Sequence, residues 1–229
     1  MCGRFDRHSS LRNFTKVLGE LDIKESDDLA GSYNVAPSQR ALVIRHGSTG
    51  LIASALEWGL IPPWAKRSEK TWPINARAET IHKRGIFRRS FFERRCLILC
   101  DGFYEWRKQS DGSKQPYYFC SPEQSPFVLA GIWERNNTQY DKPIDTFCIL
   151  TTSAGEGANF VHRRMPIRLA SISHESWLNP KISDVAFLCQ LIESAGDEWL
   201  FYPVSKYVNS PRNDSSRCVA PLQNTQEIL

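Results

Sequence analysis

The sequence predicts an α+β fold: a single domain in which a strongly curved, barrel-like mixed β-sheet carries peripheral helices. Three observations support this prediction. Strand-like segments dominate the chain, helical segments are scattered between them, and no low-complexity linker or internal repeat divides it. With 229 residues, of which 41% are hydrophobic, the chain can bury a large core. We expect the domain to span residues 1–222, with residues 223–229 as a C-terminal tail.

The expected helices share apolar residues that recur every three or four positions. The first follows Ser9 and Ser10, whose hydroxyls are typical of helix caps, and the last carries an apolar stripe that ends at Ile192. The pattern predicts helices over residues 11–21, 85–95, 173–178 and 183–194.

The expected strands are apolar segments bounded by turn residues. The turn 47–50 joins the first two strands, the turn 110–113 joins a hairpin, and the tandem prolines make 61–64 a loop, because proline cannot continue a central strand. The predicted strands are residues 41–46, 51–58, 95–107, 116–120, 127–133 and 146–152, and residues 200–208 are expected to be extended.

Composition favours a cytoplasmic protein. No apolar stretch reaches membrane-spanning length, and the N-terminus lacks the layout of a secretion signal. The seven cysteines are odd in number and irregularly spaced, which fits reduced thiols rather than disulfides. Cys96 and Cys100 lie in an apolar run, so we interpret them as thiols of a buried strand rather than as zinc ligands.

Positive charge is modest overall but concentrated locally. The net charge is +4, and residues 82–95 hold six Lys or Arg against one Glu, interleaved with aromatic residues. Arg163, Arg164 and Arg168 form a second cluster. Such patches suit a single-stranded nucleic acid groove. A solvated helix face with Phe87 and Phe91 in the core explains residues 82–95 as well, and the residues by themselves favour that interpretation.

The start of the chain carries unusual chemistry. If Met1 is removed, Cys2 presents a free α-amine and a thiol on adjacent carbons. The amine forms an imine with an aldehyde, and the thiol then closes a five-membered thiazolidine ring. An α-amine titrates at about 7.7–8.0 and an ordinary thiol at about 8.5, so both groups are usable near neutral pH. The structural alternative for Cys2 is a small buried residue.

Five short segments place polar residues beside glycine, proline or aromatic residues. Together they contain a thiol, amides, carboxylates, arginines and an imidazole, which are the parts of a covalent-catalysis site. The segments are Cys2-Gly3-Arg4-Phe5, residues 33–37 (YNVAP), residues 73–80 (PINARAET), residues 101–106 (DGFYEW) and residues 162–166 (HRRMP).

These five segments, in this order, resemble the SRAP (SOS-response-associated peptidase) family, whose members shield abasic sites in DNA. The resemblance extends from Cys2 to about Leu222 and includes residues 203–205 and 208–214 near its end. The family often has Asp after the histidine, where this chain has Arg163.

The resemblance implies four catalytic residues. Cys2 would be both the amine and the thiol nucleophile after loss of Met1, and Asn75 would hydrogen-bond the sugar or the N-terminal amine. Glu105 would move protons during imine formation, helped by a pKa that desolvation raises. His162 would shuttle protons for ring opening, release or strand scission. Each has a structural alternative: a turn residue for Asn75, an exposed strand charge for Glu105, and a structural histidine for His162.

The resemblance also implies six DNA-binding residues. Arg4, Arg77 and Arg164 would hold phosphates, which positions the strand without reading its sequence. Pro37 and Trp64 would offer apolar surfaces to bases, and Thr151 would contact a phosphate or sugar. The alternative for the arginines is a set of surface charges.

Three functions remain in view at this point. The first is an abasic-site sensor in single-stranded DNA that forms a covalent thiazolidine crosslink through Cys2 and shields the site during the DNA damage response, with lyase activity through the imine. The second is a Cys2-dependent thiol peptidase, and the third is a non-covalent single-stranded DNA-binding module. We expect a monomer without metal or organic cofactor, whose partner is single-stranded DNA that contains abasic sites. We expect no membrane association.

Overall fold

The computed structural model describes residues 2–19, 21–65, 72–137, 143–193 and 198–222. The expected C-terminal tail, residues 223–229, lies outside the described residues. Strands dominate the described chain, as predicted. They are β1 (Arg4–Arg7), β2 (Ile23–Ser26), β3 (Ser32–Val35), β4 (Arg40–His46), β5 (Leu51–Trp58), β6 (Asn75–Arg77), β7 (Arg95–Cys100), β8 (Gly102–Lys108), β9 (Lys114–Cys120), β10 (Phe127–Asn136), β11 (Ile144–Ser153), β12 (Arg164–Pro166) and β13 (Leu200–Pro203).

Five of these strands close into a barrel. The order β4-β7-β10-β11 is antiparallel throughout, β5 pairs antiparallel with β4, and a parallel pairing of β5 with β11 completes the ring. Strands β12 and β6 extend β11, and β2 extends β5. The predicted single α+β domain with a barrel-like mixed sheet is confirmed.

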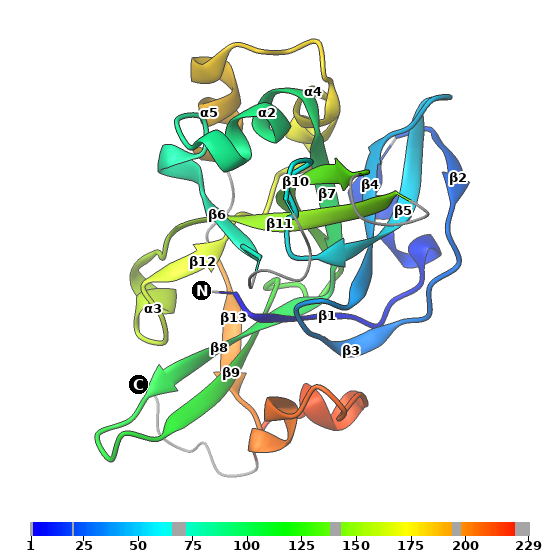
Figure 1. Ribbon diagram of the computed structural model, residues 1–229. Coiled ribbons are helices and arrows are strands. Elements are labelled where there is room, and N and C mark those ends of the chain that lie inside the picture. The colour runs from blue at the N-terminus through cyan, green and yellow to red at the C-terminus, as the bar shows by residue number, and fades with distance from the viewer. Residues whose placement is uncertain (1, 20, 66–71, 138–142, 194–197, 223–229) are drawn as a thin grey trace.

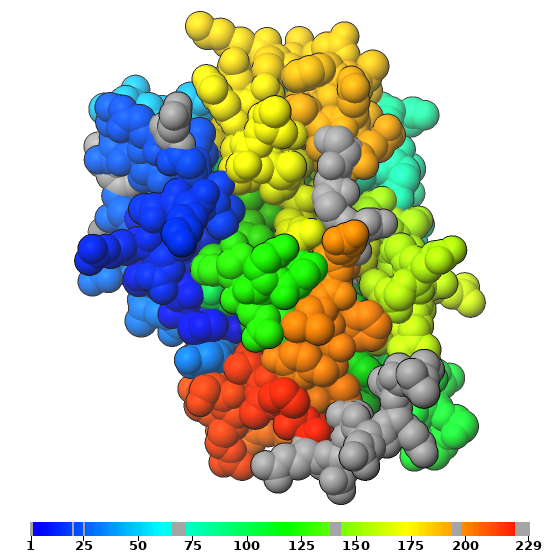
Figure 2. All heavy atoms as spheres, turned by 180° about the vertical axis from the view of Figure 1, so that it is seen from behind, coloured from blue at the N-terminus to red at the C-terminus, as the bar shows by residue number. Residues whose placement is uncertain are grey.

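A second sheet lies against the barrel, in the order β13-β9-β8-β1-β3. In Figure 1, β1 crosses the middle of the molecule, with the barrel above it and the rest of the second sheet below. The segment that follows β13 packs on this sheet. Arg4 of β1 donates to the carbonyl of Val208, and Gln115 of β9 donates to the carbonyl of Val204. Figure 2 shows this segment against both the N-terminal and the central parts of the chain.

Helices are short and peripheral. The longest, α2 (Gly85–Glu93) and α5 (Val185–Glu193), gather with α4 (His174–Leu178) at one end of the barrel (Figure 1). The others are α1 (Thr15–Leu18), α3 (Glu156–Asn159) and the 3-10 helices η1 (Leu11–Phe14), η3 (Ala78–Thr80), η4 (Ser171–Ser173), η5 (Lys206–Asn209) and η6 (Ser216–Cys218). Among the described residues, no helix is long and apolar enough to cross a bilayer.

Alternation along the barrel strands builds two cores. On β7, Leu97 and Leu99 pack in the cluster that includes α2, α4 and α5, whereas Cys96, Ile98 and Cys100 pack in the cluster shared with the second sheet. All six residues of β7 are buried because both of its faces are covered. Cys96 and Cys100 are therefore core thiols on one face, as predicted, and all seven cysteines are free.

The predicted strand over residues 95–107 is wrong in one respect, because it is two strands. At Asp101 the chain leaves the barrel and enters the second sheet, where β8 pairs with β1 and β9. The backbone N–H of Asp101 donates to the carbonyl of Asp6 (2.8 Å), and its carboxylate accepts from the backbone N–H of Ser9 (2.9 Å). Strand-forming residues flank Asp101-Gly102 on both sides, and this Asp-Gly pair is a turn signal that our strand prediction overlooked.

Two other boundaries differ from the predictions. The helix expected over residues 11–21 ends at Leu18, because Gly19 adopts a φ of 60°, and the Ser10 hydroxyl donates to the Asn13 side chain instead of capping the backbone. The extended segment expected over residues 200–208 stops at Pro203. Ser205 then caps η5 by accepting from the backbone N–H of Tyr207 (3.2 Å).

The basic run 82–95 fits the structural interpretation better than a nucleic acid groove. Phe91 is fully buried and Phe87 is partly buried against the same core. Arg95 is also buried, and its guanidinium donates to carbonyls at the ends of two helices, including Trp177 (2.5 Å) and Phe91 (2.8 Å). Burial lowers the pKa of Arg95 to about 10. This arginine therefore joins helices instead of facing solvent.

Candidate active site

Cys2 lies directly before β1, between the barrel and the second sheet. Its side chain is fully buried in the cluster that contains Phe5, Phe103 and Ile149. The thiol donates weakly to the carbonyl of Arg4, with 3.7 Å between Sγ and O. Burial raises the pKa of the Cys2 thiol well above its ordinary value, and the negative charge of Glu105 raises it further. In this setting the Cys2 thiol keeps its proton to higher pH than an ordinary cysteine does.

Asn75 holds the backbone of Cys2. Strand β6 runs parallel to β11, with Asn75 in register with Ile149, and this pairing brings the amide to the start of the chain. The Asn75 Nδ2 donates to the carbonyl of Cys2 at 2.8 Å. Its Oδ1 is buried and accepts no hydrogen bond from the described residues. The amide thus fixes one side of Cys2 and keeps an acceptor available beside it.

Glu105 lies on β8 and approaches Cys2 from the second sheet. Because β8 pairs with β1, Tyr104 lies opposite Arg4 and Phe103 opposite Phe5. The Glu105 side chain is only 5% exposed. Burial raises the pKa of its carboxyl above the ordinary value, against an opposing effect of His162. A buried carboxyl that keeps its proton to higher pH is suited to general acid–base work.

His162 follows α3 and is more open, with 32% of its side chain exposed. Its Nδ1 lies 3.9 Å from Glu105 Oε1. The same nitrogen lies 3.0 Å from both the backbone N–H and the carbonyl of Arg164. A neutral Nδ1 can accept from that N–H, and a protonated Nδ1 can donate to that carbonyl. The backbone of Arg164 therefore accommodates either protonation state of the imidazole.

The fold thus brings together four side chains that the sequence separates widely. Asn75 donates a hydrogen bond to the carbonyl of Cys2, and the charge of Glu105 raises the pKa of the Cys2 thiol. His162 in turn lies 3.9 Å from Glu105. A thiol, an amide, a carboxyl and an imidazole gathered in this way can bind a carbonyl compound covalently and move the protons that this requires.

The Arg4 guanidinium is engaged mainly by hydrogen bonds within the protein. Its Nη1 donates to Asn34 Oδ1 (3.0 Å) and to the carbonyl of Val208 (2.8 Å), and its Nη2 donates to the carbonyl of Asn209 (3.2 Å). Burial lowers the pKa of Arg4. These bonds fasten η5 to the strand that carries Cys2.

Arg164 and Thr151 are also engaged within the protein. The Arg164 guanidinium binds both oxygens of Glu79 (2.6 and 3.1 Å), and it donates to the carbonyl (2.6 Å) and hydroxyl (3.2 Å) of Thr151. Thr151 is fully buried. Burial, the largest single effect, would raise the pKa of Glu79. The hydrogen bonds with Arg164, a backbone hydrogen bond and the charges of Arg164 and Arg77 together place that pKa below its ordinary value. Our sequence analysis missed Glu79, although it lies inside one of the five segments.

Arg77, Pro37 and Trp64 lie on the surface. Arg77 is exposed at the end of β6, one residue before η3, and lies in register with Thr151. Pro37 is exposed in the turn between β3 and β4, and Trp64 is 74% exposed. These three side chains are available to a ligand without rearrangement of the hydrogen bonds described above.

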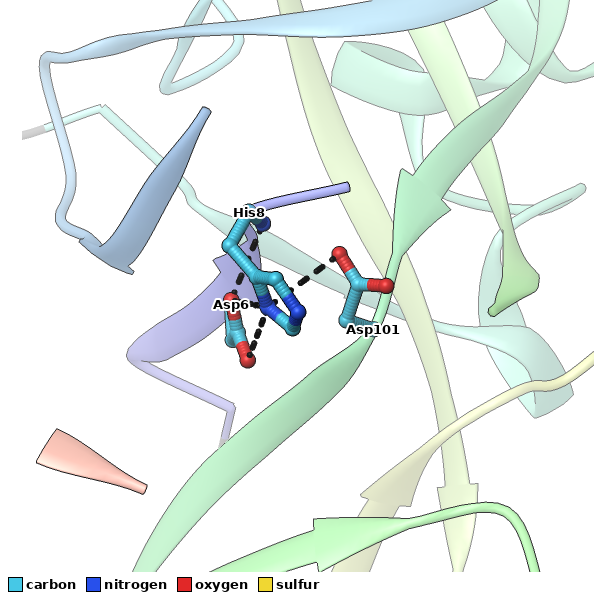
Figure 3. A group of neighbouring side chains, drawn as sticks. All are labelled: Asp6, His8 and Asp101. Atoms are coloured by element: carbon cyan, nitrogen blue, oxygen red, sulfur yellow. Dashed lines mark hydrogen bonds and ion pairs between the residues drawn. The ribbon is translucent and has the colours of Figure 1, made fainter. Parts of the chain in front are cut away.

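A second polar cluster, which our sequence analysis did not identify, stands beside the site. Figure 3 shows the His8 imidazole between the carboxylates of Asp6 and Asp101. The His8 Nδ1 lies 2.9 Å from Asp6 Oδ1 and 3.6 Å from Asp101 Oδ2, and Tyr118 donates to Asp6 Oδ2 at 2.7 Å. The two carboxylates and the imidazole are close enough to hold a metal ion. Because hydrogen bonds already engage both oxygens of Asp6, we interpret the cluster as an ion pair between the exposed His8 and two buried carboxylates.

Comparison with known proteins fits this arrangement. The family model "SOS response associated peptidase (SRAP)" matches residues 1–211. Abasic site processing protein YoaM of Bacillus subtilis is 38% identical over 221 residues, which cover 94% of this chain and 96% of that protein. Abasic site processing protein YedK of Escherichia coli is 28% identical and covers 97% of this chain and 100% of its own length. In the abasic site processing protein HMCES of Gallus gallus, 30% identity extends over 84% of this chain and 66% of that protein.

Solved structures show the same fold. A protein from Bacteroides thetaiotaomicron superimposes with a TM-score of 0.79 at 24% identity, covering 97% of this chain and 100% of its own. A protein from Bordetella bronchiseptica gives 0.73 at 22% identity, covering 89% and 100%. The extent of the family match and its agreement with the curated relatives lead to one conclusion: this chain belongs to the SOS response associated peptidase (SRAP) family.

Proposed function

We propose that the protein senses abasic sites in single-stranded DNA and binds them covalently through Cys2 once Met1 has been removed. The product is a thiazolidine crosslink that shields the site during the DNA damage response. The names of the relatives support the substrate. The observation that carries the proposal is the bond from Asn75 to the carbonyl of Cys2 beside the buried Glu105. Residue 1 lies outside the described residues, so its removal is part of the proposal.

The chemistry proceeds in three balanced steps. The α-amine of Cys2 adds to the aldehyde of the open abasic sugar and gives a carbinolamine. Protonated Glu105 gives its proton to the hydroxyl, which leaves as water, and an iminium ion and a carboxylate remain. The Cys2 thiol then adds to the iminium carbon, and its proton returns to Glu105. The sum is amine, aldehyde and thiol converted to thiazolidine and one water, with Glu105 restored.

The directions of the two pKa shifts support these roles. Burial keeps a proton on Glu105 to higher pH than on an ordinary carboxyl, as the acid step needs. Burial also keeps the proton on Cys2, so ring closure needs a base close by. The carboxylate that forms when water leaves is that base, and it forms at the moment when the thiol must give up its proton.

Asn75 and His162 complete the site in this proposal. Asn75 holds the Cys2 backbone so that the amine is oriented, and its Oδ1 can accept from the amine or a sugar hydroxyl. His162, partly exposed beside Glu105, can move protons between the site and solvent. The iminium intermediate also allows strand scission by elimination, and we propose His162 as the base for this lesser lyase activity.

The DNA strand would run over the exposed residues near the site. Arg77 would bind a phosphate, and Trp64 and Pro37 would pack against bases. Arg4, Arg164 and Thr151 are engaged within the protein, so we propose that they position the site and contact the strand through the donors that remain.

A denaturing gel tests the proposal. The protein is mixed with a single-stranded oligonucleotide that carries one abasic site, beside an unmodified strand and a strand whose aldehyde has been reduced to an alcohol. A shifted band that survives denaturation is expected for the abasic strand alone. It should vanish in Cys2→Ala and persist in Cys189→Ala, which removes a thiol outside the site.

Mass spectrometry of the intact protein decides whether Met1 is absent from the sample. With Met1 absent, the lack of a covalent band would refute the shield. Binding that disappears at high salt would then favour a non-covalent DNA-binding module. Cys2-dependent cleavage of added peptides would favour the thiol peptidase.

A further inference from the structure

A second contact joins the two segments that form the Glu105–His162 pair. Arg107 follows Glu105 by two residues on β8, and Phe160 precedes His162 by two residues after α3. The Arg107 guanidinium carbon lies 3.6 Å from the centre of the Phe160 ring. Alternate residues of a strand share a face and lie about 6.8 Å apart. Arg107 therefore lies on the same face of β8 as Glu105, about 6.8 Å further along the strand.

The Arg107–Phe160 pair is open to solvent. Phe160 is 46% exposed, and Arg107 is half-buried. Within the part of the chain that the structure describes, the Arg107 guanidinium makes a contact with the Phe160 ring and no hydrogen bond or ion pair. In this it differs from Arg4 and Arg164, whose guanidinium groups are engaged by protein acceptors. Stacking on a ring occupies the face of a guanidinium and leaves its N–H edge free for an anion.

The pair is also held in place. Phe160 meets the Tyr117 ring edge to face, with 6.3 Å between the ring centres. Tyr117 lies opposite Glu105 in the pairing of β8 with β9. The backbone N–H of Phe160 donates to the carbonyl of Gly157 at 3.3 Å, which fixes the turn. A preformed cation above an aromatic ring costs little ordering when a ligand binds.

We propose that Arg107 and Phe160 bind the nucleotide that flanks the abasic site on the β8 side, with the Arg107 N–H edge on its phosphate and the exposed Phe160 ring against its sugar or base. The proposal rests on the proposed function, in which the abasic sugar reaches Cys2 and the flanking nucleotide lies beside Glu105 and His162. A phosphate fits the free cation, and an aromatic ring beside it suits a nucleotide better than a free anion.

The test uses a single-stranded oligonucleotide with a tetrahydrofuran abasic analogue, which has no aldehyde and therefore reports binding without a crosslink. Affinity is measured by fluorescence anisotropy at several salt concentrations for the wild type, Arg107→Gln and Phe160→Leu. Lys108→Gln is the matched control, because it removes the same charge from the next residue of β8, on the opposite face. Arg107→Gln should weaken binding about tenfold at low salt and reduce the salt slope by about 0.7. Phe160→Leu should weaken binding with an unchanged slope, and Lys108→Gln should change affinity less than about twofold.

A neutral methylphosphonate at each flanking position in turn locates the contact. At one flank it should weaken the wild type by the same factor as Arg107→Gln and add nothing to that variant. Equal effects of Arg107→Gln and Lys108→Gln at every position would overturn the proposal, as would a loss of thermal stability in Arg107→Gln with no change in salt slope. The proposed function is tested separately, by whether the wild type forms a crosslink with a strand that carries a true abasic site.

Discussion

The Nδ2 of Asn75 donates a 2.8 Å hydrogen bond to the backbone carbonyl of Cys2, and this bond ties strand β6 to the beginning of the chain. The start of a chain usually has considerable conformational freedom. Here the residue that would supply both nucleophiles is fixed by an amide on one side and packed into a core on the other. The backbone and thiol of Cys2 are therefore ordered by the fold itself, which is the preorganisation that the proposed reaction would need.

Asn75→Ala should slow the formation of the crosslink about fivefold, because one hydrogen bond to the Cys2 backbone is worth about 1 kcal/mol and its loss frees the amine. Asn75→Asp should be slower still, since a carboxylate oxygen would face the carbonyl of Cys2. Single-turnover kinetics with an abasic oligonucleotide measure both variants. Asn137→Ala, at an exposed asparagine, is the control. Equal rates for Asn75→Ala and the wild type would show that the bond does not orient the nucleophile.

Glu105→Gln should slow crosslinking by a factor that depends on pH. The raised pKa means that the wild-type carboxyl carries its proton to higher pH than an ordinary glutamate and loses it as the pH rises through that value. The ratio of wild-type to Glu105→Gln crosslinking rates should therefore be about 10²-fold or more at the acidic end and should fall as the pH rises. Rates from about pH 5 to pH 9 give the ratio, with the exposed Glu156→Gln as the control. A ratio that does not depend on pH would contradict the acid role.

Arg4→Gln should act on stability and Arg77→Gln on DNA binding. Loss of the Arg4 guanidinium removes the donor from the carbonyls of Val208 and Asn209, at a cost of about 1–3 kcal/mol. For a chain of this size the melting temperature should fall by about 2–4 °C per kcal/mol. Arg77→Gln should leave the melting temperature unchanged and reduce the salt slope of DNA binding by about 0.7. Calorimetry and anisotropy separate the two, and the opposite assignment of effects would show that Arg4 is the phosphate contact.

His8 should make stability depend on pH. Its pKa is raised from 6.5, first by the hydrogen bond to Asp6 and also by the charges of Asp6 and Asp101, against burial and Arg7. The folded protein then holds this proton more tightly than the unfolded chain. The contribution is fully present below about pH 6.5 and is lost as the pH rises through the raised value. Burial also raises the pKa of Asp6, which changes stability in the same direction at lower pH.

Melting temperatures of the wild type and His8→Gln measure this contribution. The difference between them should shrink as the pH rises from about 6 to about 8.5. His46→Gln, at an exposed histidine of β4, is the control. Parallel curves for the wild type and His8→Gln would show that the Asp6–His8 pair is not linked to folding.

Local patterns predicted much of the fold. The strand pair β4–β5 and its turn, the helix α2 and the core thiols Cys96 and Cys100 follow from residue spacing and turn chemistry, which act over a few positions. The break at Asp101 was missed although Asp101-Gly102 is a turn signal, because strand-forming residues continue on both sides of it. The change of sheet itself depends on contacts with Asp6 and Ser9, more than ninety residues away, which no local pattern records.

By itself, the sequence determined which chemical groups the candidate site contains, since Cys2, Asn75, Glu105 and His162 could be named from their motifs. Only the tertiary structure decided how the arginines around them are used. Arg4 bonds Val208, 204 residues away, and Arg164 bonds Glu79, 85 residues away, whereas Arg77 and Arg107 remain available. The physical reason is that a guanidinium binds whichever acceptors the fold brings within hydrogen-bonding distance, and a linear pattern records the donor but not the acceptor.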